Sequence, residues 1–345
     1  MQLWIPHFKL VNIGDQSITE VLPACLSSLI KFARQKTMNN NPLNKTTGSL
    51  CPNLPIQVTS VPYTPNSTAQ AITLITCIVN GISCPVAIVE NLLVFMVVLR
   101  RRSLRTTYNT SVLCLAFTDL LIAMFIQPAF IAYQSGKYRS STYECIPYFI
   151  KTVFEFWCVG LTFVTLALIT LMRYFAVFRP FQYRIFATPL RATLIIISGW
   201  LLWSVFSFSL RFSPSGMNLK AYSILCSILV TVTLIETIIV SVKLHLEIKQ
   251  RAVKHTSEQD HNRAITATRT ILIITAAFFI CFFPILCASI VHQTGLVEVD
   301  VVFHSIYPLA ECALFLTALL NPAIYVWRNV SVRNSLKDLT KFTNS

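Results

Sequence analysis

The chain has 345 residues, of which 54% are hydrophobic and only 12% are charged, and its formal net charge is +14. A soluble domain usually has about 25% charged residues, so the composition excludes an ordinary soluble domain and indicates a membrane protein. A nucleic-acid-binding protein would need a basic face on a soluble fold, so nucleic acid is not an expected partner.

Seven apolar stretches follow one another along the chain, and each is long enough to cross a membrane. A helix needs roughly 20 apolar residues to span about 30 Å of hydrocarbon. We therefore predict an all-α membrane protein built as a seven-transmembrane helix bundle over residues 71–327. The predicted spans cover about residues 71–99, 109–133, 147–175, 190–212, 221–246, 264–292 and 301–327.

Basic residues gather in every second connection between the spans and after the last span. By the positive-inside rule these segments lie in the cytoplasm, which places the N-terminus outside and the C-terminus inside. The basic residues concerned are Arg100, Arg101, Arg102, Arg105, Arg179, Arg184, Lys243, Lys249, Arg251, Lys254, Arg263, Arg328, Arg333, Lys337 and Lys341.

Residues 1–70 precede the first span and have the composition of an extracellular tail. Asn44 and Asn66 begin Asn-X-Ser/Thr triplets, so we predict that both carry N-linked glycans. Residues 1–37 lack the basic region and continuous apolar core of a signal peptide. Met38 opens an ordinary polar tail, and we hypothesise that it is the true start of the chain, which N-terminal sequencing of the expressed protein tests.

Residues 328–345 are predicted to form a short amphipathic helix and tail in the cytoplasm. Apolar residues recur there at helical spacing among basic ones, a pattern typical of helices that lie on a membrane surface. Membrane lipids are therefore expected partners. The apolar positions are Val332, Leu336, Leu339 and Phe342, and the basic positions are Arg333, Lys337 and Lys341.

Six short motifs occur in order along the predicted spans. They are Glu90-Asn91, Leu115-Ala116-Phe117-Thr118-Asp119, Arg173-Tyr174 with Arg179-Pro180 downstream, Gly199-Trp200, Cys281-Phe282-Phe283-Pro284 and Asn321-Pro322-Ala323-Ile324-Tyr325. Together the motifs resemble those of a rhodopsin-like (class A) G-protein-coupled receptor, over a region from about Asn91 to Phe342. A cysteine-free loop and a proline-free fifth span make the chain loosely similar to the melanocortin, cannabinoid, lysophospholipid and adenosine group.

The resemblance implies a plasma-membrane receptor that transduces binding of an extracellular small molecule or peptide into activation of a heterotrimeric G protein. Prolines inside helices kink them, which suits a conformational switch. The residues expected to contact the G protein are Arg173, Tyr174, Phe181 and Tyr325. The residues expected to form the switch are Phe278, Phe282, Pro284, Asn321 and Pro322.

Asp119 is a carboxylate near the membrane centre, where a charge is costly without partners. The cluster around this carboxylate resembles the sodium site of the family. The resemblance implies a site formed here by Asp119, Thr162 and Asn321. The alternative is a buried hydrogen-bonded cluster without a metal. No other cofactor is expected.

Two further carboxylates, Glu155 and Glu311, are predicted to line an outer ligand pocket. Glu155 precedes Arg173 by 18 residues, or five turns, so it lies on the same helix face about 27 Å towards the outside. Glu311, in the seventh span, should face the same cavity. The two carboxylates would suit a cationic amine or a basic peptide. In the alternative interpretation, Glu155 pairs with Lys151 one turn away, and Glu311 pairs with His304 or is protonated.

Cys145 stands near the start of the third span, where most family members have a disulfide to the loop after the fourth span. The corresponding loop here, residues 211–222, has no cysteine. Cys145 is therefore free or paired elsewhere, and we suggest Cys51 in the tail as its partner.

Met172 replaces the acidic residue that the family usually has before the arginine of its third span. That acid ordinarily pairs with the arginine and holds the resting state, and a second acid in the sixth span is replaced by Ala264. Losing an ion pair worth about 1 kcal/mol shifts a two-state receptor several-fold. We therefore predict raised basal activity.

Two other functions remain open at this point. The chain can be a receptor-like protein that signals constitutively or partners other receptors without its own ligand. It can also be a transporter or channel, although such proteins often contain repeats and these seven spans do not form two similar halves. An enzyme is not expected, because the sequence has no HExxH, GxSxG or Walker motif.

Overall fold

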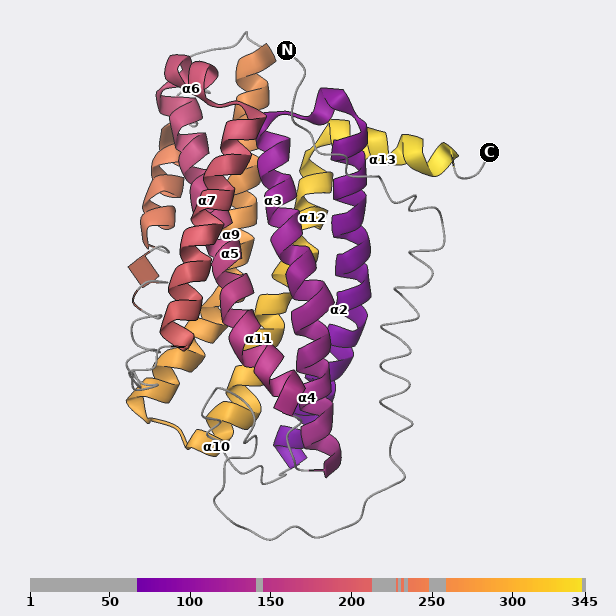
Figure 1. Ribbon diagram of the computed structural model, residues 1–345, viewed down its shortest axis with the longest axis vertical. Helices are drawn as coiled ribbons and strands as arrows, with labels where there is room; N and C mark the ends of the chain where they lie inside the picture. Colours follow the sequence, from indigo (N-terminus) through magenta and orange to yellow (C-terminus); the bar gives the residue numbers. More distant parts are fainter. Residues whose placement is uncertain are drawn as a thin grey trace. The chain divides into compact units, whose positions relative to one another are not determined.

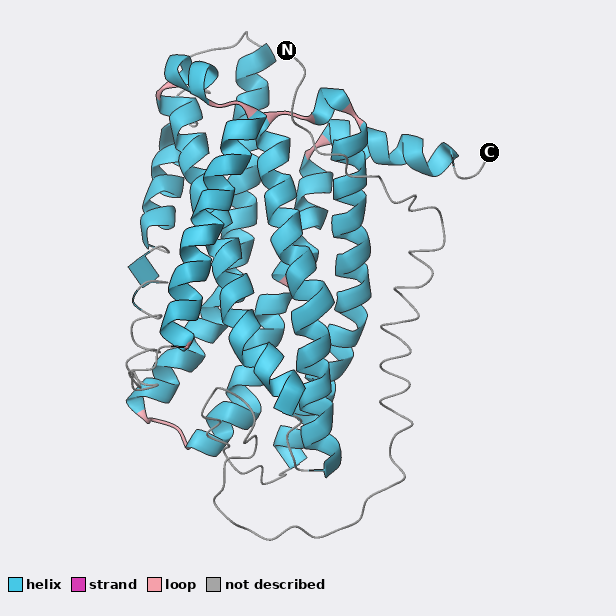
Figure 2. Cartoon of the chain, in the orientation of Figure 1, coloured by secondary structure: helices cyan, strands magenta, loops and turns pink. Residues whose placement is uncertain are grey.

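The computed structural model describes residues 67–140, 145–212, 228, 231–232, 235–247 and 259–342, all within the unit Gly48–Ser345. These residues form helices joined by short turns, and no strand occurs among them (Figures 1 and 2). Six helical segments are long and apolar enough to cross a membrane, and each overlaps a predicted span. Of the predicted fifth span, residues 228, 231–232 and 235–246 are described and all are helical, while its other residues lie outside the described ones. The helical membrane fold is confirmed.

The first three membrane spans are built from long helices. The first is α2 (Ser67–Arg100), and the third is α5 (Cys145–Phe178). The second combines α3 (Thr107–Leu121), a π-helical turn (Ile122–Ile126) and α4 (Gln127–Ser140). Both α2 and α5 have 34 residues, or about 51 Å, so they extend beyond about 30 Å of hydrocarbon. This explains why α2 begins before the predicted span.

The short helix α6 (Pro180–Phe186) leads into α7 (Pro189–Arg211), which is the fourth span. Thr188 caps the start of α7, since its side-chain oxygen accepts a hydrogen bond from the backbone N–H of Arg191. The sixth span belongs to α9 (Gln259–Thr294), which contains Pro284.

The seventh span is segmented. It runs through α10 (Val299–Val301), a π-helical turn (Val302–Ile306), α11 (Tyr307–Phe315) and α12 (Thr317–Arg328). The following helix α13 (Val330–Phe342) leaves the bundle at its end (Figure 1). Its buried Val332 and its half-buried Leu336 pack against the core, as expected for an amphipathic helix.

Both π-helical turns precede a proline by two residues, Pro128 in α4 and Pro308 in α11. A proline donates no backbone hydrogen bond and its ring clashes with the carbonyl four residues earlier. That carbonyl falls inside each π-helical turn, where the wider winding accommodates the ring. Two prolines therefore remain within continuous spans.

The described helices bury polar side chains and expose large apolar ones. Asn91 and Asp119 are completely buried, whereas Ile82, Leu202 and Ile280 are 66%, 74% and 73% exposed. Soluble proteins rarely bury such polar groups, while membrane bundles turn them inward, away from lipid. The outer faces of the helices therefore fit a hydrocarbon environment.

Helix α7 packs closely on α5 at two glycines, and a side chain at Gly199 of α7 would come within 2.8 Å of Val164 in α5. A side chain at Gly160 would overlap the indole ring of Trp203. The indole N–H of Trp203 donates a hydrogen bond of 3.1 Å to the carbonyl of Trp157. This contact fixes the aromatic wall that α7 presents to the interior.

Candidate functional site

A cavity of about 680 Å³ lies between α5, α7, α9 and α11. Most of its wall is apolar and aromatic, and its polar side chains gather at the end of the bundle predicted to face outside, here named the outer end. The polar residues lining it are Lys151, Thr152, Glu155 and Glu311. A cavity of this kind is typical of small-molecule sites, which hold about 300–1,000 Å³.

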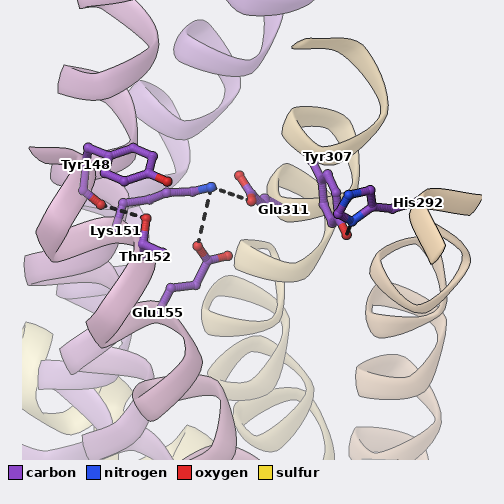
Figure 3. Close-up of polar contacts among 7 residues, drawn as sticks. All are labelled: Tyr148, Lys151, Thr152, Glu155, His292, Tyr307 and Glu311. Atoms are coloured by element: carbon purple, nitrogen blue, oxygen red, sulfur yellow. Dashed lines mark hydrogen bonds and ion pairs between the residues drawn. The ribbon is translucent and has the colours of Figure 1, made fainter. Parts of the chain in front are cut away.

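Lys151 lies between the two predicted ligand-binding carboxylates (Figure 3). Its Nζ atom is 2.5 Å from Oε1 of Glu311 and 3.9 Å from Oε2 of Glu155. Glu155 stands one turn further along α5, whereas Glu311 belongs to α11, so the shorter ion pair crosses the bundle. Lys151 Nζ also lies 5.6 Å from the ring centre of Tyr133 in α4. The structure thus brings Glu155 and Glu311 together, with an internal cation between them.

His304, the other partner considered for Glu311, pairs elsewhere. Its Nε2 atom lies 3.2 Å from Oδ1 of Asp300, one turn earlier in the same span. On the side of Glu311 facing α9, the hydroxyl of Tyr307 is 3.4 Å from Nδ1 of His292 (Figure 3). The pairing of Glu311 with Lys151 was not anticipated from the sequence.

Three aromatic rings connect the cavity to the predicted switch. Phe163 of α5 lies edge-to-face against both Phe278 and Phe282 of α9, with ring centroids 4.7 Å apart in each pair. Phe163 and Phe282 line the cavity, and Pro284 follows in α9. A molecule in the cavity would therefore touch rings that pack directly against Phe278.

The predicted sodium-binding residues come together only in part. Nδ2 of Asn321 is 3.2 Å and 3.0 Å from the two carboxylate oxygens of Asp119, and both side chains are buried. The hydroxyl of Thr162 instead donates to Thr118 Oγ1 at 3.1 Å. Asn91 donates to the carbonyl of Ala318 at 2.9 Å.

The donor set of this cluster nevertheless fits a small hard cation. The side-chain oxygens of Asn91 and Asn321 are buried and accept no hydrogen bond from any described residue. Together with the Asp119 carboxylate they are oxygen ligands of the kind that such cations accept. Pro322 follows Asn321 within α12 and is buried with it.

Arg173 is 5% exposed, near the end of α5 predicted to face the cytoplasm, here named the inner end. Its guanidinium carbon lies 4.8 Å from the ring centre of Tyr108 in α3, the geometry of a cation–π contact. Among the described residues, no carboxylate forms an ion pair with it. Met172, in place of the expected acid, packs against the apolar core.

Tyr325 is completely buried at the same end. Its hydroxyl donates a 2.9 Å hydrogen bond to Oδ1 of Asn109, and its ring centroid is 6.0 Å from that of Tyr108. Tyr108 therefore contacts both Arg173 and Tyr325. Asn109 opens an Asn-Thr-Ser triplet, but this buried, hydrogen-bonded side chain belongs to the protein interior.

The two other predicted G-protein contacts differ in exposure. Tyr174 is half-buried and stacks on Phe178 within α5, at a centroid distance of 4.4 Å. Phe181 in α6 is 83% exposed. This apolar ring, beyond the end of α5, is therefore accessible for contact with another protein.

The comparison with known protein families agrees with this geometry. The family described as "7 transmembrane receptor (rhodopsin family)" matches residues 90–219 and 211–325. The chain belongs to this family. It is therefore a G-protein-coupled receptor that transduces the binding of an extracellular ligand, and members of this family are signalling receptors, not enzymes.

Relatives of this receptor include the histamine H2 receptors of Homo sapiens and Pongo pygmaeus. Each is 23% identical to the chain over 297 residues, which cover 79% of the chain and 81% of the relative. The transporter and channel interpretation finds no support in these matches.

Three predicted sites of the receptor, Asn44, Asn66 and Cys51, lie outside the described residues. Cys145, the first residue of α5, is disulfide-bonded. Its partner also lies outside the described residues, so the pairing with Cys51 stays a prediction.

Two residues that position the receptor's charged groups were missed from the sequence. The bridging role of Lys151 depends on the rotation of α5 against α11, which no local pattern encodes, although a lysine in an apolar span was itself a signal. Tyr108 has no such signal, because a tyrosine just before an apolar run is ordinary at a membrane interface.

Proposed function

We propose that the receptor lies in the plasma membrane with its N-terminus outside, and that Glu155 binds the positive charge of an extracellular amine or basic peptide. The carboxylate of Glu155 supports this most directly. It lines the cavity, and its one ion-pair contact among the described residues is the 3.9 Å approach of Lys151. Nearby aromatic rings, including Trp203 and Phe282, suit a cation attached to an apolar body.

The similar receptors named for histamine, a small amine, also favour an amine over a peptide as the ligand. The test is a cell assay of G-protein activation with histamine and a panel of monoamines. In Glu155→Gln, the active amine should need about thirtyfold or higher concentration, because truncating a buried charge partner is costly. The control is Thr152→Val, which removes a pocket hydroxyl without changing charge. An unchanged response in Glu155→Gln contradicts the proposal.

A heterotrimeric G protein is the proposed partner at the inner end, with Arg173, Tyr174, Phe181 and Tyr325 at the contact. The exposed ring of Phe181 supports an apolar part of this surface. Both Phe181→Ala and Arg173→Ala should lower G-protein activation at equal surface expression. Activation that persists in both variants would place the contact elsewhere.

A sodium ion is proposed to bind at Asp119 and Asn321, supported by the buried side-chain oxygens that accept no hydrogen bond within the described part of the chain. Thr162, which bonds to Thr118, would reach such an ion only after changing its hydrogen bond. Replacing potassium with sodium at constant ionic strength should raise the Tm of the purified wild type but not of Asp119→Asn. Equal Tm values of the wild type in both salts would leave the hydrogen-bonded cluster without a metal.

A second candidate function is constitutive signalling without a ligand. The observation in its favour is that Lys151 already supplies a cation to both carboxylates. In that case, a surface-expressed receptor would activate G proteins equally with and without every amine in the panel.

A further inference from the structure

The three charged residues of the outer site are not equivalent. Lys151 approaches Glu311 to 2.5 Å but Glu155 only to 3.9 Å. A charge-assisted hydrogen bond has its optimum near about 2.7–2.9 Å, so only the first contact is a fully formed hydrogen-bonded ion pair. Figure 3 shows the ammonium of Lys151 directed across the bundle towards Glu311, with Glu155 below it.

The position of Lys151 is fixed from two sides. Glu311, on α11, is buried with a side chain that is 7% exposed. The ring of Tyr133 on α4 lies 5.6 Å from the lysine ammonium on another side. The ammonium of Lys137 lies 5.2 Å from the same ring, but Lys137 is not among the described residues that line the cavity.

Glu155 therefore keeps most of its capacity to accept hydrogen bonds. Among the described residues it has one ion-pair contact, at 3.9 Å, and no hydrogen bond, and it borders the cavity. When both carboxyl groups are ionised, the two carboxylates and one ammonium leave the lining of the cavity with one negative charge. An uncompensated charge in an apolar site is costly, so a bound group with one positive charge would balance it.

We propose that Lys151 and Glu311 form a fixed internal ion pair, and that Glu155 alone receives the cation of the ligand, so that the site selects ligands with one positive charge. This inference rests on the proposed function, since it refines how the same site recognises a cation. Lys151 acts as a specificity-determining residue, because it occupies the second carboxylate and denies it to a second cation.

If Lys151 and Glu311 form an internal pair, a substitution of Lys151 should restore the ligand binding that is lost when Glu311 is replaced. In Glu311→Gln, Lys151 loses its partner and turns to Glu155, so binding of a monoamine should weaken about thirtyfold or more. In the double variant with Lys151→Met and Glu311→Gln, Glu155 is free again and binding should recover to within about threefold of wild type. A direct role of Glu311 in ligand binding predicts no recovery.

The test uses purified full-length receptor and two matched probes, benzylamine with one ammonium group and 4-(aminomethyl)benzylamine with two. Binding is measured as the rise in Tm against probe concentration, which does not depend on G-protein coupling. Wild type should prefer benzylamine, and Lys151→Met should reverse the preference by at least about tenfold. Arg101→Gln, which removes an exposed charge away from the cavity lining, is the control and should behave as wild type. Unchanged selectivity in Lys151→Met overturns the proposal.

A failure of the proposed function is distinguishable from a failure of this inference. If neither probe shifts the Tm of wild type at any concentration, amine binding is wrong, and the ion pair is judged without ligand. Double-variant cycles then compare the coupling of Lys151 with Glu311 against that with Glu155, with a difference of about 2–4 °C in Tm expected. Coupling to Glu155 that equals or exceeds coupling to Glu311 overturns the internal pair.

Discussion

Two cations on the same helix, Lys151 and Arg173, are stabilised in different ways. Lys151, at the outer end of α5, lies between the carboxylates of Glu155 and Glu311. Arg173, at the inner end, packs on the ring of Tyr108 and forms no ion pair with a described carboxylate. The outer charge has carboxylate partners, and a cationic ligand can take its place beside the more distant one, Glu155. The inner charge depends on the packing of α3 against α5.

This difference suits the two ends to different tasks. A binding site must exchange its own contacts for those of a ligand, which ion pairs allow because their partners are interchangeable in charge. A coupling surface must respond to the relative positions of helices, and a ring contact is lost as soon as α3 and α5 separate. This difference between the two ends is tested by removing the carboxylate partners of Lys151 at the outer end, or by adding a carboxylate beside Arg173 at the inner end.

The largest effect is expected from leaving Lys151 without any carboxylate. The double variant Glu155→Gln and Glu311→Gln should lower stability by about 3–5 kcal/mol, because a buried charge remains uncompensated. Surface expression and Tm measure the loss. Adding Lys151→Met to this variant should recover most of the lost stability. If the double variant is as stable as wild type, the ion pairs of Lys151 do not contribute to stability.

At the inner end, removing the ring should release Arg173. Tyr108→Leu abolishes a desolvated cation–π contact worth about 2 kcal/mol, so basal G-protein activation should rise several-fold at equal surface expression. Tyr108→Phe keeps the ring face and is the matched control. If both variants raise basal activation equally, the ring does not restrain Arg173.

Adding a carboxylate beside Arg173 should have a smaller effect in the opposite direction. Met172→Asp supplies an adjacent ion-pair partner worth about 1 kcal/mol, so basal activation should fall about fivefold. Met172→Asn, uncharged and of similar size, should not lower it to the same extent. Unchanged basal activation in Met172→Asp would contradict the prediction that the missing acid raises basal activity.

The smallest effect is expected where a pair of charges is exposed. Arg101, which directly follows α2, lies 2.7 Å from Asp338 of α13, with the two side chains 45% and 49% exposed. Exposed pairs contribute about 0–1 kcal/mol, so Arg101→Gln should leave Tm and signalling within error of wild type. A large loss would show that α13 depends on this contact for its position.

The fold was predictable because the hydropathy of a segment indicates directly whether that segment can cross the membrane. Long apolar runs identified the six spans that the described residues contain, and Val332 and Leu336 indicated the packed face of α13. The π-helical turns before Pro128 and Pro308 were missed, although both prolines stand in the sequence. A proline inside a span predicts a disturbance, but neighbouring helices decide its form.

The candidate site was predictable only within single helices. Helical spacing placed Glu155 on the interior face of α5, where it lines the cavity. The ion pair of Lys151 with Glu311 joins residues 160 positions apart, and it depends on how two helices are rotated against each other. The contact of Tyr108 with Arg173 is tertiary in the same sense.

From the disulfide at Cys145 we expect the outer site to depend on redox conditions. Lys151 lies six residues further along α5, about 9 Å along the helix axis. The crosslink therefore restrains the start of the helix that carries Lys151 and Glu155 on its following turns. Disulfides persist in oxidising compartments and are lost in reducing ones. A mild reductant outside the cell should consequently blunt the response to ligand, although neither charged residue is itself redox-active.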